Sequence, residues 1–206
     1  MPVIHCTSVA ASIADANACE ICGHASRKNR SLWNTRGIIF PFMTTLVTGA
    51  FGCIGAWTIR GLLAAGEHPV VFDLGDDPWR VRMIAGPDAP GRVVVVNGDI
   101  TDRESLGRVV RDHAIRRVIH LAAWQIPLCR QDPPRGAAIN VVGTANVFEA
   151  ARAAGGQIER VVYASSAAVF GGPSLYPPGP IKDAAPAHPA THYGVYKVAN
   201  EETARV

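Results

Sequence analysis

The sequence predicts an α/β fold with a doubly wound parallel sheet, and three features carry this prediction. Continuous runs of Val, Ile and Leu recur from residue 43 onward, and segments with helical spacing of apolar residues separate them. Strands that are buried on both faces of a parallel sheet have such continuous apolar runs. Right-handed crossovers then place helices on both faces of the sheet. The third feature is a glycine-rich turn directly after the first apolar run.

Length and composition indicate one globular domain. The chain has 206 residues, of which 48% are hydrophobic and 18% charged, and it can bury one core. The net charge of +3 is spread along the chain, so we expect no nucleic-acid partner. The sequence has no uninterrupted apolar run long enough to predict a membrane span. Five scattered cysteines do not form a secreted disulfide framework, so we expect a cytoplasmic protein.

Residues 1–42 differ in character from the rest of the chain. They show no sustained helical or strand period, and we interpret them as a disordered extension that precedes a natural domain start at Met43. Cys19, Cys22 and His24 in "CEICGH" leave a zinc-binding interaction protein open as an alternative. A single CxxC pair without a second pair at metal spacing is a weak signal, so we predict no metal site.

The domain predicted over 43–206 begins with a strand, a helix and a second strand. The first strand, "TTLVT" at 44–48, is short and apolar. The helix over 53–65 stops at Gly66 and carries apolar residues on one face: Ile54, Ile59, Leu62 and Leu63. The second strand is "PVVFD" at 69–73.

The middle of the domain continues the alternation. A third strand is expected at 92–99, and Thr101 and Glu104 after it have the spacing of a capping box. The helix that follows has apolar residues at i, i+3, i+4 and i+7: Leu106, Val109, Val110 and His113. The fourth strand is expected at 117–123.

The last part of the domain contributes a long helix, a fifth strand and a final helix. The helix over 136–154 places Val141, Ala145 and Phe148 on one face. The fifth strand is expected at 159–166, and the final helix at 192–205.

The glycine-rich turn "TGAFGCIG" predicts a phosphate-binding loop. Gly49, Gly52 and Gly55 recur every third residue between strand and helix, a looser form of the dinucleotide-binding fingerprint of Rossmann-type folds. Asp73 ends the second strand 18 residues after Gly55. A carboxylate there accepts hydrogen bonds from ribose hydroxyls and repels a 2′-phosphate, which favours NAD over NADP. The alternatives are a structural turn and a strand-end cap, and Asp99, at the end of the third strand, faces either the adenine or solvent.

Three residues near the end of the chain predict proton transfer. Tyr193 and Lys197 are four residues apart and share one face of the predicted final helix. A nearby ammonium favours the phenolate and lowers the tyrosine pKa, so Tyr193 can act as acid and base. Ser166, at the carboxyl end of the fifth strand, can orient a substrate oxygen. The alternative is a solvated helix face, and the rival Tyr196 points away from Lys197.

These motifs together resemble the NAD-dependent epimerase/dehydratase family of extended short-chain dehydrogenases/reductases. The segments that match are "TGAFGCIG", Asp73, "GDI" at 98–100, "HLAA" at 120–123, "NVVGT" at 140–144, "YASSAAVFG" and "YGVYK". The resemblance covers the chain from Met43 on. It implies bound NAD, hydride transfer at a secondary alcohol carbon and typically a sugar-nucleotide substrate, as in oxidoreductases and isomerases.

The resemblance also assigns residues. It implies that Ser166, Tyr193 and Lys197 are catalytic, with Ser165 as the second choice for the serine. It implies a cofactor-binding set made of Gly49, Phe51, Gly52, Cys53, Ile54, Gly55, Asp73, Asp99, Ile100, Leu121, Ala122, Ala123, Asn140, Tyr193 and Lys197. Pairing of two copies through the helix at 136–154 and the one that begins at 192 is implied as well.

The chain departs from the family pattern in two ways. Ala167 and Ala168 stand where the 4,6-dehydratases carry an acid and base pair for water loss, so dehydration by that route is not expected. Family members run on well beyond the YxxxK helix, so we expect a Rossmann-type sheet that is incomplete at its C-terminus and a substrate domain that is largely absent. An NAD-binding or sensing module without turnover therefore stays open as an alternative function.

Overall fold

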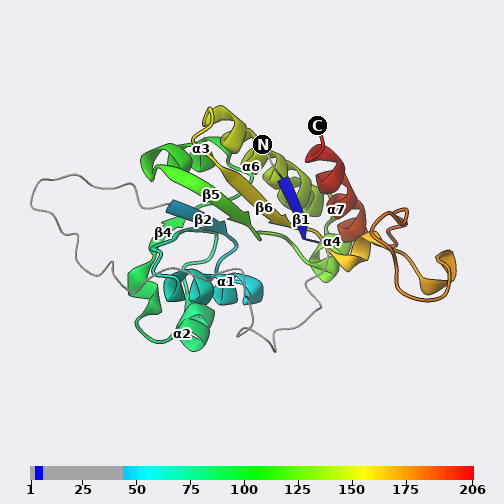
Figure 1. The fold of residues 1–206 in the computed structure, drawn as a ribbon, viewed down its shortest axis with the longest axis horizontal. Helices are drawn as coiled ribbons and strands as arrows, with labels where there is room; N and C mark the ends of the chain where they lie inside the picture. Colours follow the sequence, from blue (N-terminus) through cyan, green and yellow to red (C-terminus); the bar gives the residue numbers. More distant parts are fainter. Residues whose placement is uncertain (1–2, 7–43) are drawn as a thin grey trace, which may run out of the picture.

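The strands form one parallel sheet. The computed structural model describes residues 3–6, for which only the backbone is considered, and residues 44–206. The sheet order is β1-β6-β5-β2-β3-β4, and every pairing is parallel (Figure 1). The strands are β1 Val3–Cys6, β2 Thr44–Thr48, β3 Val70–Asp73, β4 Val94–Asn97, β5 Ile115–His120 and β6 Arg160–Ala164. The five strands expected after Met43 are all present, and the predicted doubly wound fold is confirmed.

Helices cover both faces of the sheet. They are α1 Cys53–Ala64, α2 Trp79–Ala85, α3 Arg103–Asp112, α4 Ile126–Gln131, α5 Pro133–Ala137, α6 Gly143–Ala153 and α7 His192–Thr203. A π-helical turn, η3 Ala138–Val142, joins α5 to α6, and three short 3-10 turns are η2 Ala89–Arg92, η4 Ala167–Val169 and η5 Pro173–Leu175. Helices α1 and α2 lie on one side of the sheet, and α3, α6 and α7 lie on the other (Figure 1).

Two apolar cores follow from the alternation of side chains along the strands. Leu46 packs into one core, with Val109 of α3 and Val147 of α6. Its neighbour Val47 packs into the other core, with Ile59 of α1. Because successive side chains of a strand point to opposite faces, one continuous apolar run supplies both cores. All five of these side chains are buried.

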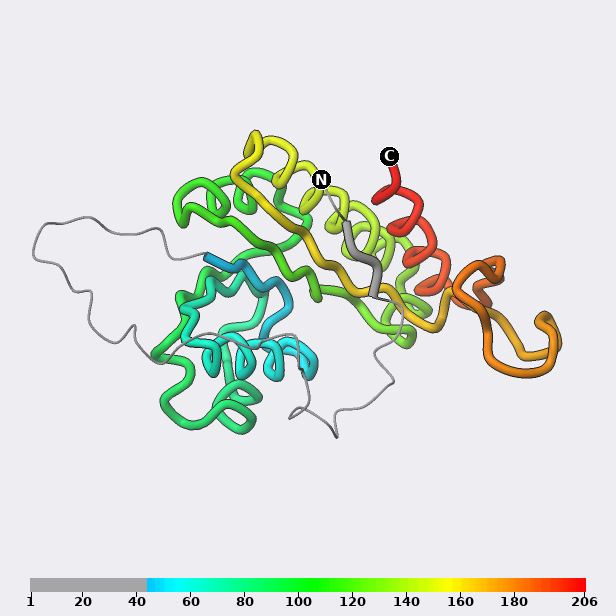
Figure 2. The backbone as a smooth tube through the Cα atoms, in the orientation of Figure 1, coloured from blue at the N-terminus to red at the C-terminus, as the bar shows by residue number. Residues whose placement is uncertain are grey.

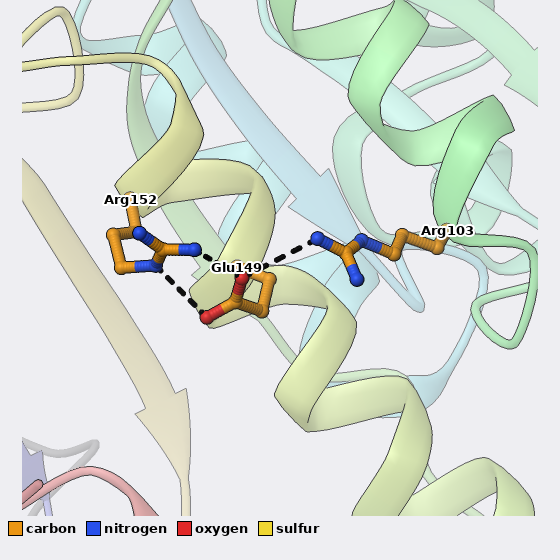
Figure 3. A network of polar contacts seen from close by, with 3 residues as sticks. All are labelled: Arg103, Glu149 and Arg152. Carbon is orange, nitrogen blue, oxygen red and sulfur yellow. Dashed lines mark hydrogen bonds and ion pairs between the residues drawn. The ribbon is translucent and has the colours of Figure 1, made fainter.

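An exposed ion-pair network fastens α3 to α6. The Glu149 carboxylate on α6 accepts hydrogen bonds from Arg152, with the shorter contact at 2.7 Å, and lies 3.4 Å from Arg103 Nη2 of α3 (Figure 3). The hydrogen bond from Arg152 is the main cause of the lowered pKa of Glu149. Since the pairs are exposed to solvent, they contribute little to the stability of the fold.

Two details of the predicted helices are wrong. The N-cap of α3 is Asp102, whose side chain accepts from Ser105 N at 3.0 Å, whereas Thr101 donates to Asp99 instead of capping the helix. The helix expected over 136–154 contains the π turn η3, and its extra residue rotates the helix about its axis. The buried positions of α6 are Gly143, Thr144, Asn146, Val147, Ala150 and Ala151. Of the predicted face, Phe148 packs against the core, and Val141 and Ala145 are partly buried.

The remaining features of the fold are a long connection before α7 and the first strand of the sheet. The segment between β6 and α7, which runs from yellow to orange, loops out beyond the sheet before the chain returns in α7 (Figure 2). Of the predicted extension 1–42, the structure describes the backbone of β1, which pairs with β6. The set Cys19, Cys22 and His24 lies outside the described residues. Among the described residues, no helix has both the length and the apolar character needed to cross a membrane.

Candidate active site

The carboxyl ends of the central strands open into one cavity. Its volume is about 420 Å³, and its walls come from the glycine-rich turn and from the ends of β3, β5 and β6 together with α7. Ligands of open α/β sheets bind at this edge, where the chain passes from the strands to the helices on either face. Among the residues that the structure describes, there is no group of three or more His, Cys, Asp or Glu side chains that could hold a metal ion.

The glycine-rich turn forms a tight passage from β2 into α1. Gly49 has a φ of +70°, and a Cβ there would lie 2.6 Å from the backbone nitrogen of Ala122. A Cβ on Gly55 would lie 2.3 Å from the carbonyl oxygen of Gly49, so α1 starts directly against the turn. Only glycine fits both positions. Cys53 and Ile54, in the first turn of α1, line the cavity. The first N–H groups of a helix have no partner within it, so an anionic group is favoured at this end of α1.

Asp73 links the end of β3 to this turn. Its Oδ2 accepts the backbone N–H of Phe51 at 2.9 Å, and its Oδ1 accepts that of Gly75 at 3.1 Å. The carboxylate is therefore held in place on the cavity wall by two backbone donors. Carboxylate oxygens have further lone pairs, so Asp73 can still accept hydrogen bonds from hydroxyl groups of a ligand.

Two of the predicted catalytic residues, Tyr193 and Lys197, line the other end of the cavity, and the third, Ser166, lies beside Tyr193. Tyr193 and Lys197 lie on α7 with exposed fractions of 8% and 4%. Ser166 is the second residue after β6, and its side chain is a hydrogen-bond partner of Tyr193. Lys197 Nζ lies 5.6 Å from the centre of the Tyr193 ring and donates to the carbonyl of Ala164 at 2.7 Å. This arrangement joins an acid-base group, a charged group and a hydroxyl in one place.

Burial dominates the titration of the two helix residues. Burial raises the pKa of Tyr193, and the hydrogen bond from Ser166 opposes it. Burial lowers the pKa of Lys197 to about 8. The expectation that the ammonium makes the Tyr193 pKa low is therefore wrong for this structure. The physical reason is that the loss of water around the phenolate outweighs the favourable interactions that remain.

A buried polar network supports the site from behind. The Thr144 hydroxyl donates to the carbonyl of Asn140 at 2.7 Å, so it must accept from His120 Nε2 at 3.0 Å. His120 Nδ1 then accepts from the Thr48 hydroxyl at 2.6 Å. Asn200 of α7 donates to both the Asn140 carbonyl and the Thr144 hydroxyl. The network ties α7 and the π turn to the end of β2.

Most of the predicted cofactor-binding residues line the cavity: Gly49, Gly52, Cys53, Ile54, Gly55, Asp73, Asp99, Ile100, Leu121, Ala122, Ala123, Tyr193 and Lys197. Phe51, Asn140 and Ser166 do not line it. Phe51 donates its backbone N–H to Asp73. The Asn140 side chain accepts from the backbone N–H of Trp124 and donates to the Trp124 carbonyl. Asp99 lines the cavity, and its Oδ1 also accepts the backbone N–H of Thr101 at 2.9 Å.

The cavity also has lining residues outside the predicted cofactor-binding set: Phe72, Leu74, Gly98, Trp124, Gln125, Ile139, Ala164 and Ser165. Of these, Ser165 is the second choice for the catalytic serine. All but Ile139 directly adjoin a predicted strand end or follow one by a few residues, so their position after the strand was the available signal. Ile139 lies in the π turn, which the sequence pattern did not indicate.

The structure also distinguishes the two adjacent serines. Ser165 donates its hydroxyl to the carboxylate of Glu201 on α7, whereas Ser166 contacts Tyr193. Tyr196 donates to the carbonyl of Pro133 at 2.8 Å, away from the cavity. Ser165 lines the cavity, but Ser166 is the serine that contacts Tyr193, and this contact favours Ser166 as the partner of Tyr193.

Comparisons with known proteins agree on one family. The sequence model described as GDP-mannose 4,6 dehydratase matches residues 46–206. UDP-glucose 4-epimerase of Mycolicibacterium smegmatis is 39% identical over 162 residues, which cover 77% of this chain and 49% of the relative. The UDP-glucose 4-epimerase of Lacticaseibacillus casei is 34% identical and covers 78% of this chain and 45% of its own length.

Solved structures give the same picture. The crystal structure of Thermus thermophilus UDP-glucose 4-epimerase in complex with NAD superposes with a TM-score of 0.68 at 29% identity, and covers 79% of this chain and 50% of its own. That of Brucella ovis UDP-glucose 4-epimerase in complex with NAD gives 0.65 at 29% identity, over 78% of this chain and 46% of its own. The chain thus spans about half the length of the relatives that it matches.

Proposed function

Because this chain belongs to the family described as GDP-mannose 4,6 dehydratase, and with it to the extended short-chain dehydrogenases/reductases, we propose that it takes part in NAD-dependent redox chemistry at a secondary alcohol carbon of a nucleotide sugar. The observation that carries the proposal is that Tyr193 and Lys197 line one end of a cavity whose other end is formed by the glycine turn and Asp73. Ser166 is the hydrogen-bond partner of Tyr193 at that end.

The cavity fits NAD by its chemistry. The turn at Gly49 and Gly55 leaves no room for side chains, which is the cradle that a pyrophosphate needs against a helix N-terminus. Asp73 offers oxygens to ribose hydroxyls and disfavours a phosphate in their place. When bound, NAD supplies the acceptor for a hydride from a carbon centre, and its reduced form supplies the donor.

The residues of α7 and β6 would handle the proton. Tyr193 would take the proton of a substrate hydroxyl and return it when the carbonyl is reduced again. Ser166, already hydrogen-bonded to Tyr193, would hold the same oxygen in place. With a pKa of about 8, Lys197 is mostly charged at neutral pH. Its charge would favour the phenolate once substrate and cofactor are in place.

Epimerisation or simple dehydrogenation fits these residues better than dehydration. Ala167 and Ala168 follow Ser166 in η4, and neither side chain can move a proton. Loss of water would need an acid and a base at that place. The relatives named UDP-glucose 4-epimerase support a substrate of the nucleotide-sugar class. In an epimerisation, a substrate alcohol carbon would lose a hydride to NAD while Tyr193 takes the hydroxyl proton, and the hydride and the proton would then return to the same carbonyl.

We also propose that two copies pair through their exposed helices. Val142 of η3 and Val195 of α7 are 51% and 48% exposed, and both belong to the helices that the family resemblance assigns to pairing. Light scattering of the purified chain would measure the oligomeric state.

A cytoplasmic location is part of the proposal, because the two cysteines within the described residues, Cys53 and Cys129, are free thiols.

The proposed function is tested by replacing Tyr193. Removing its hydroxyl removes the proton acceptor, so Tyr193→Phe should lower turnover of UDP-glucose or its 4-epimer by about 10²–10⁴-fold while calorimetry still detects NAD binding. Tyr196→Phe is the matched control, because Tyr196 lies on the same helix and donates away from the cavity, to Pro133. Equal turnover of the two variants would contradict the proposal. NAD binding without any turnover in the unmodified chain would favour the sensing module.

A further inference from the structure

The proposed catalytic groups come from two separate elements. Ser166 follows β6, whereas Tyr193 and Lys197 belong to α7, and a long connection that loops out beyond the sheet lies between them (Figure 2). The chain itself therefore does not set the separation between the Ser166 and Tyr193 hydroxyls. That separation depends on contacts that hold the end of β6 against α7.

Two polar contacts join these elements close to the site. Lys197 Nζ donates to the carbonyl of Ala164 at 2.7 Å. The Glu201 carboxylate accepts the hydroxyl hydrogen of Ser165, the residue directly before Ser166. Lys197 and Glu201 are four residues apart on α7 and so lie on the same face of the helix. Together the contacts fix two successive residues of the β6 end, Ala164 and Ser165, to successive turns of α7.

Glu201 differs in its surroundings from the glutamate beside it. Glu201 is half-buried and turned toward β6. It also contributes, after burial, to the raised pKa of Tyr163 in that strand, which is about 12. Glu202 is exposed and pairs with Arg205 on its own helix, with 61% of each side chain exposed. A carboxylate that only kept the helix soluble would resemble Glu202.

We propose that Glu201 is a positioning residue, which holds Ser165 and thereby keeps the hydroxyl of Ser166 within hydrogen-bond reach of Tyr193. The inference rests on the proposed function in that Ser166 and Tyr193 form the catalytic pair. Glu201 itself does not line the cavity. It acts through the register between β6 and α7.

The pKa of Tyr193 reports this register without any turnover. The groups that face Tyr193 are Ser166, Lys197 and Cys129, and the hydrogen bond from Ser166 lowers the pKa of the phenol against the effect of burial. If the Ser166 hydroxyl moves away, the phenol pKa rises. Loss of a negative charge at Glu201 alone would lower that pKa, because it removes repulsion of the phenolate. The sign of the change therefore separates a loss of position from a loss of charge.

The experiment introduces 3,5-difluorotyrosine at position 193 of the full chain, since this phenol ionises near neutral pH and gives its own ¹⁹F signal. Ser166→Ala should raise the phenol pKa. Glu201→Ala and Ser165→Ala should each raise it too, by an amount that approaches the shift in Ser166→Ala. Glu201→Gln keeps an oxygen that accepts from Ser165, so the pKa should not rise. Glu202→Ala is the matched control and should leave the pKa unchanged.

The outcomes are separable from those of the proposed function. An unchanged or lower phenol pKa in Glu201→Ala, or no rise in Ser166→Ala, overturns the positioning role even if the chain turns over nucleotide sugars. If Glu201→Ala does not fold, Ser165→Ala removes the same hydrogen bond from the strand side and decides the question. Conversely, the expected shifts in a chain without turnover support the positioning role and count against the proposed function alone.

Discussion

His120 shows how its neighbours fix the state of one buried side chain. The single hydrogen of the Thr144 hydroxyl goes to the Asn140 carbonyl, so His120 must donate from Nε2 and accept at Nδ1. A second proton would have no acceptor, because Thr48 already donates to Nδ1. Burial, with a further contribution from the charge of Lys197, lowers the pKa of His120 to about 3. The imidazole is therefore neutral in the folded chain at any ordinary pH.

This state predicts a pH dependence of stability. Above pH 6.5, the ordinary pKa, His120 is neutral in both the folded and the unfolded chain. Between pH 6.5 and about pH 3, His120 is protonated in the unfolded chain but stays neutral in the folded chain, so the free energy of unfolding falls as the pH falls. His120→Gln keeps one donor and one acceptor but does not titrate. Urea unfolding from pH 7 to pH 4 should show a shallower decline in the variant, by up to about 1.4 kcal/mol per pH unit. Parallel curves would contradict the assignment.

At this scale the sequence predicted which residues meet but not their state. Spacing along a helix brings Tyr193 and Lys197 together, and the end of a strand delivers Ser166, so both follow from local geometry. The raised pKa of Tyr193 depends on burial by the whole fold, which no local pattern reports. The hydrogen bond between Ser165 and Glu201 joins residues that are 36 positions apart, and no local sequence pattern in either segment predicts it.

At the scale of elements, α1 carries two glycines with opposite roles. A Cβ on Gly55 would meet the Gly49 carbonyl oxygen at 2.3 Å and Ala50 Cα at 2.5 Å. A Cβ on Gly61, further along the same helix, meets nothing within 4 Å. The first glycine is required by contact between the helix and the turn, whereas the second only adds freedom to the unfolded chain.

Replacing each glycine by alanine should therefore change stability in opposite directions. Gly55→Ala forces the turn and α1 apart and should destabilise the chain by about 1–3 kcal/mol, with loss of NAD affinity. Gly61→Ala should stabilise it by about 0.5–1 kcal/mol and leave NAD binding unchanged. Denaturant unfolding and calorimetry measure both quantities. Unimpaired NAD binding in Gly55→Ala would show that the turn does not serve as the phosphate cradle.

Helix details were the least predictable level of the fold. Thr101 and Glu104 have the spacing of a capping box, but the carboxylate of Asp102, one residue after Thr101, caps α3 instead. The π turn at η3 lets Asn140 reach three backbone or sulfur partners at once, including the Gly136 carbonyl at 3.0 Å. Such a turn is stabilised by tertiary hydrogen bonds and leaves no mark on apolar spacing. The predicted helix is therefore interrupted by this turn, and of its predicted face Phe148 packs against the core.

For the whole molecule, the sheet explains why the fold was the easiest feature to predict. Central strands of a parallel sheet are buried on both faces and read as apolar runs, as in β2 and β3, and such runs appear in the sequence without any knowledge of their partners. The order β4-β3-β2-β5-β6 then follows from right-handed crossovers that reverse direction at β2. The same reversal opens the cavity between the ends of β2 and β5, so the site and the fold have one origin.

The final prediction concerns coupling between this cavity and the entire sheet. Ligand that binds only the folded chain, at a free concentration of about 100 times its Kd, stabilises that chain by about 2.7 kcal/mol, or about 5–10 °C in melting temperature. NAD should produce this shift. At the same concentration it should stabilise Asp73→Ala by about 1.4 kcal/mol or less, because the variant lacks an ionised acceptor.

Hydrogen exchange decides whether the whole sheet shares in this stabilisation. The glycine turn contacts both cores, through Ala50 and Phe51 in one and through the closely packed Ala122 in the other. If the chain unfolds as one unit, NAD should slow exchange of the core amides of β2 and β5 by the same factor as those of α1. Protection confined to the turn and α1 would mean instead that the two faces of the sheet unfold separately. NADP is the control and should protect neither region at equal concentration, since Asp73 disfavours its phosphate.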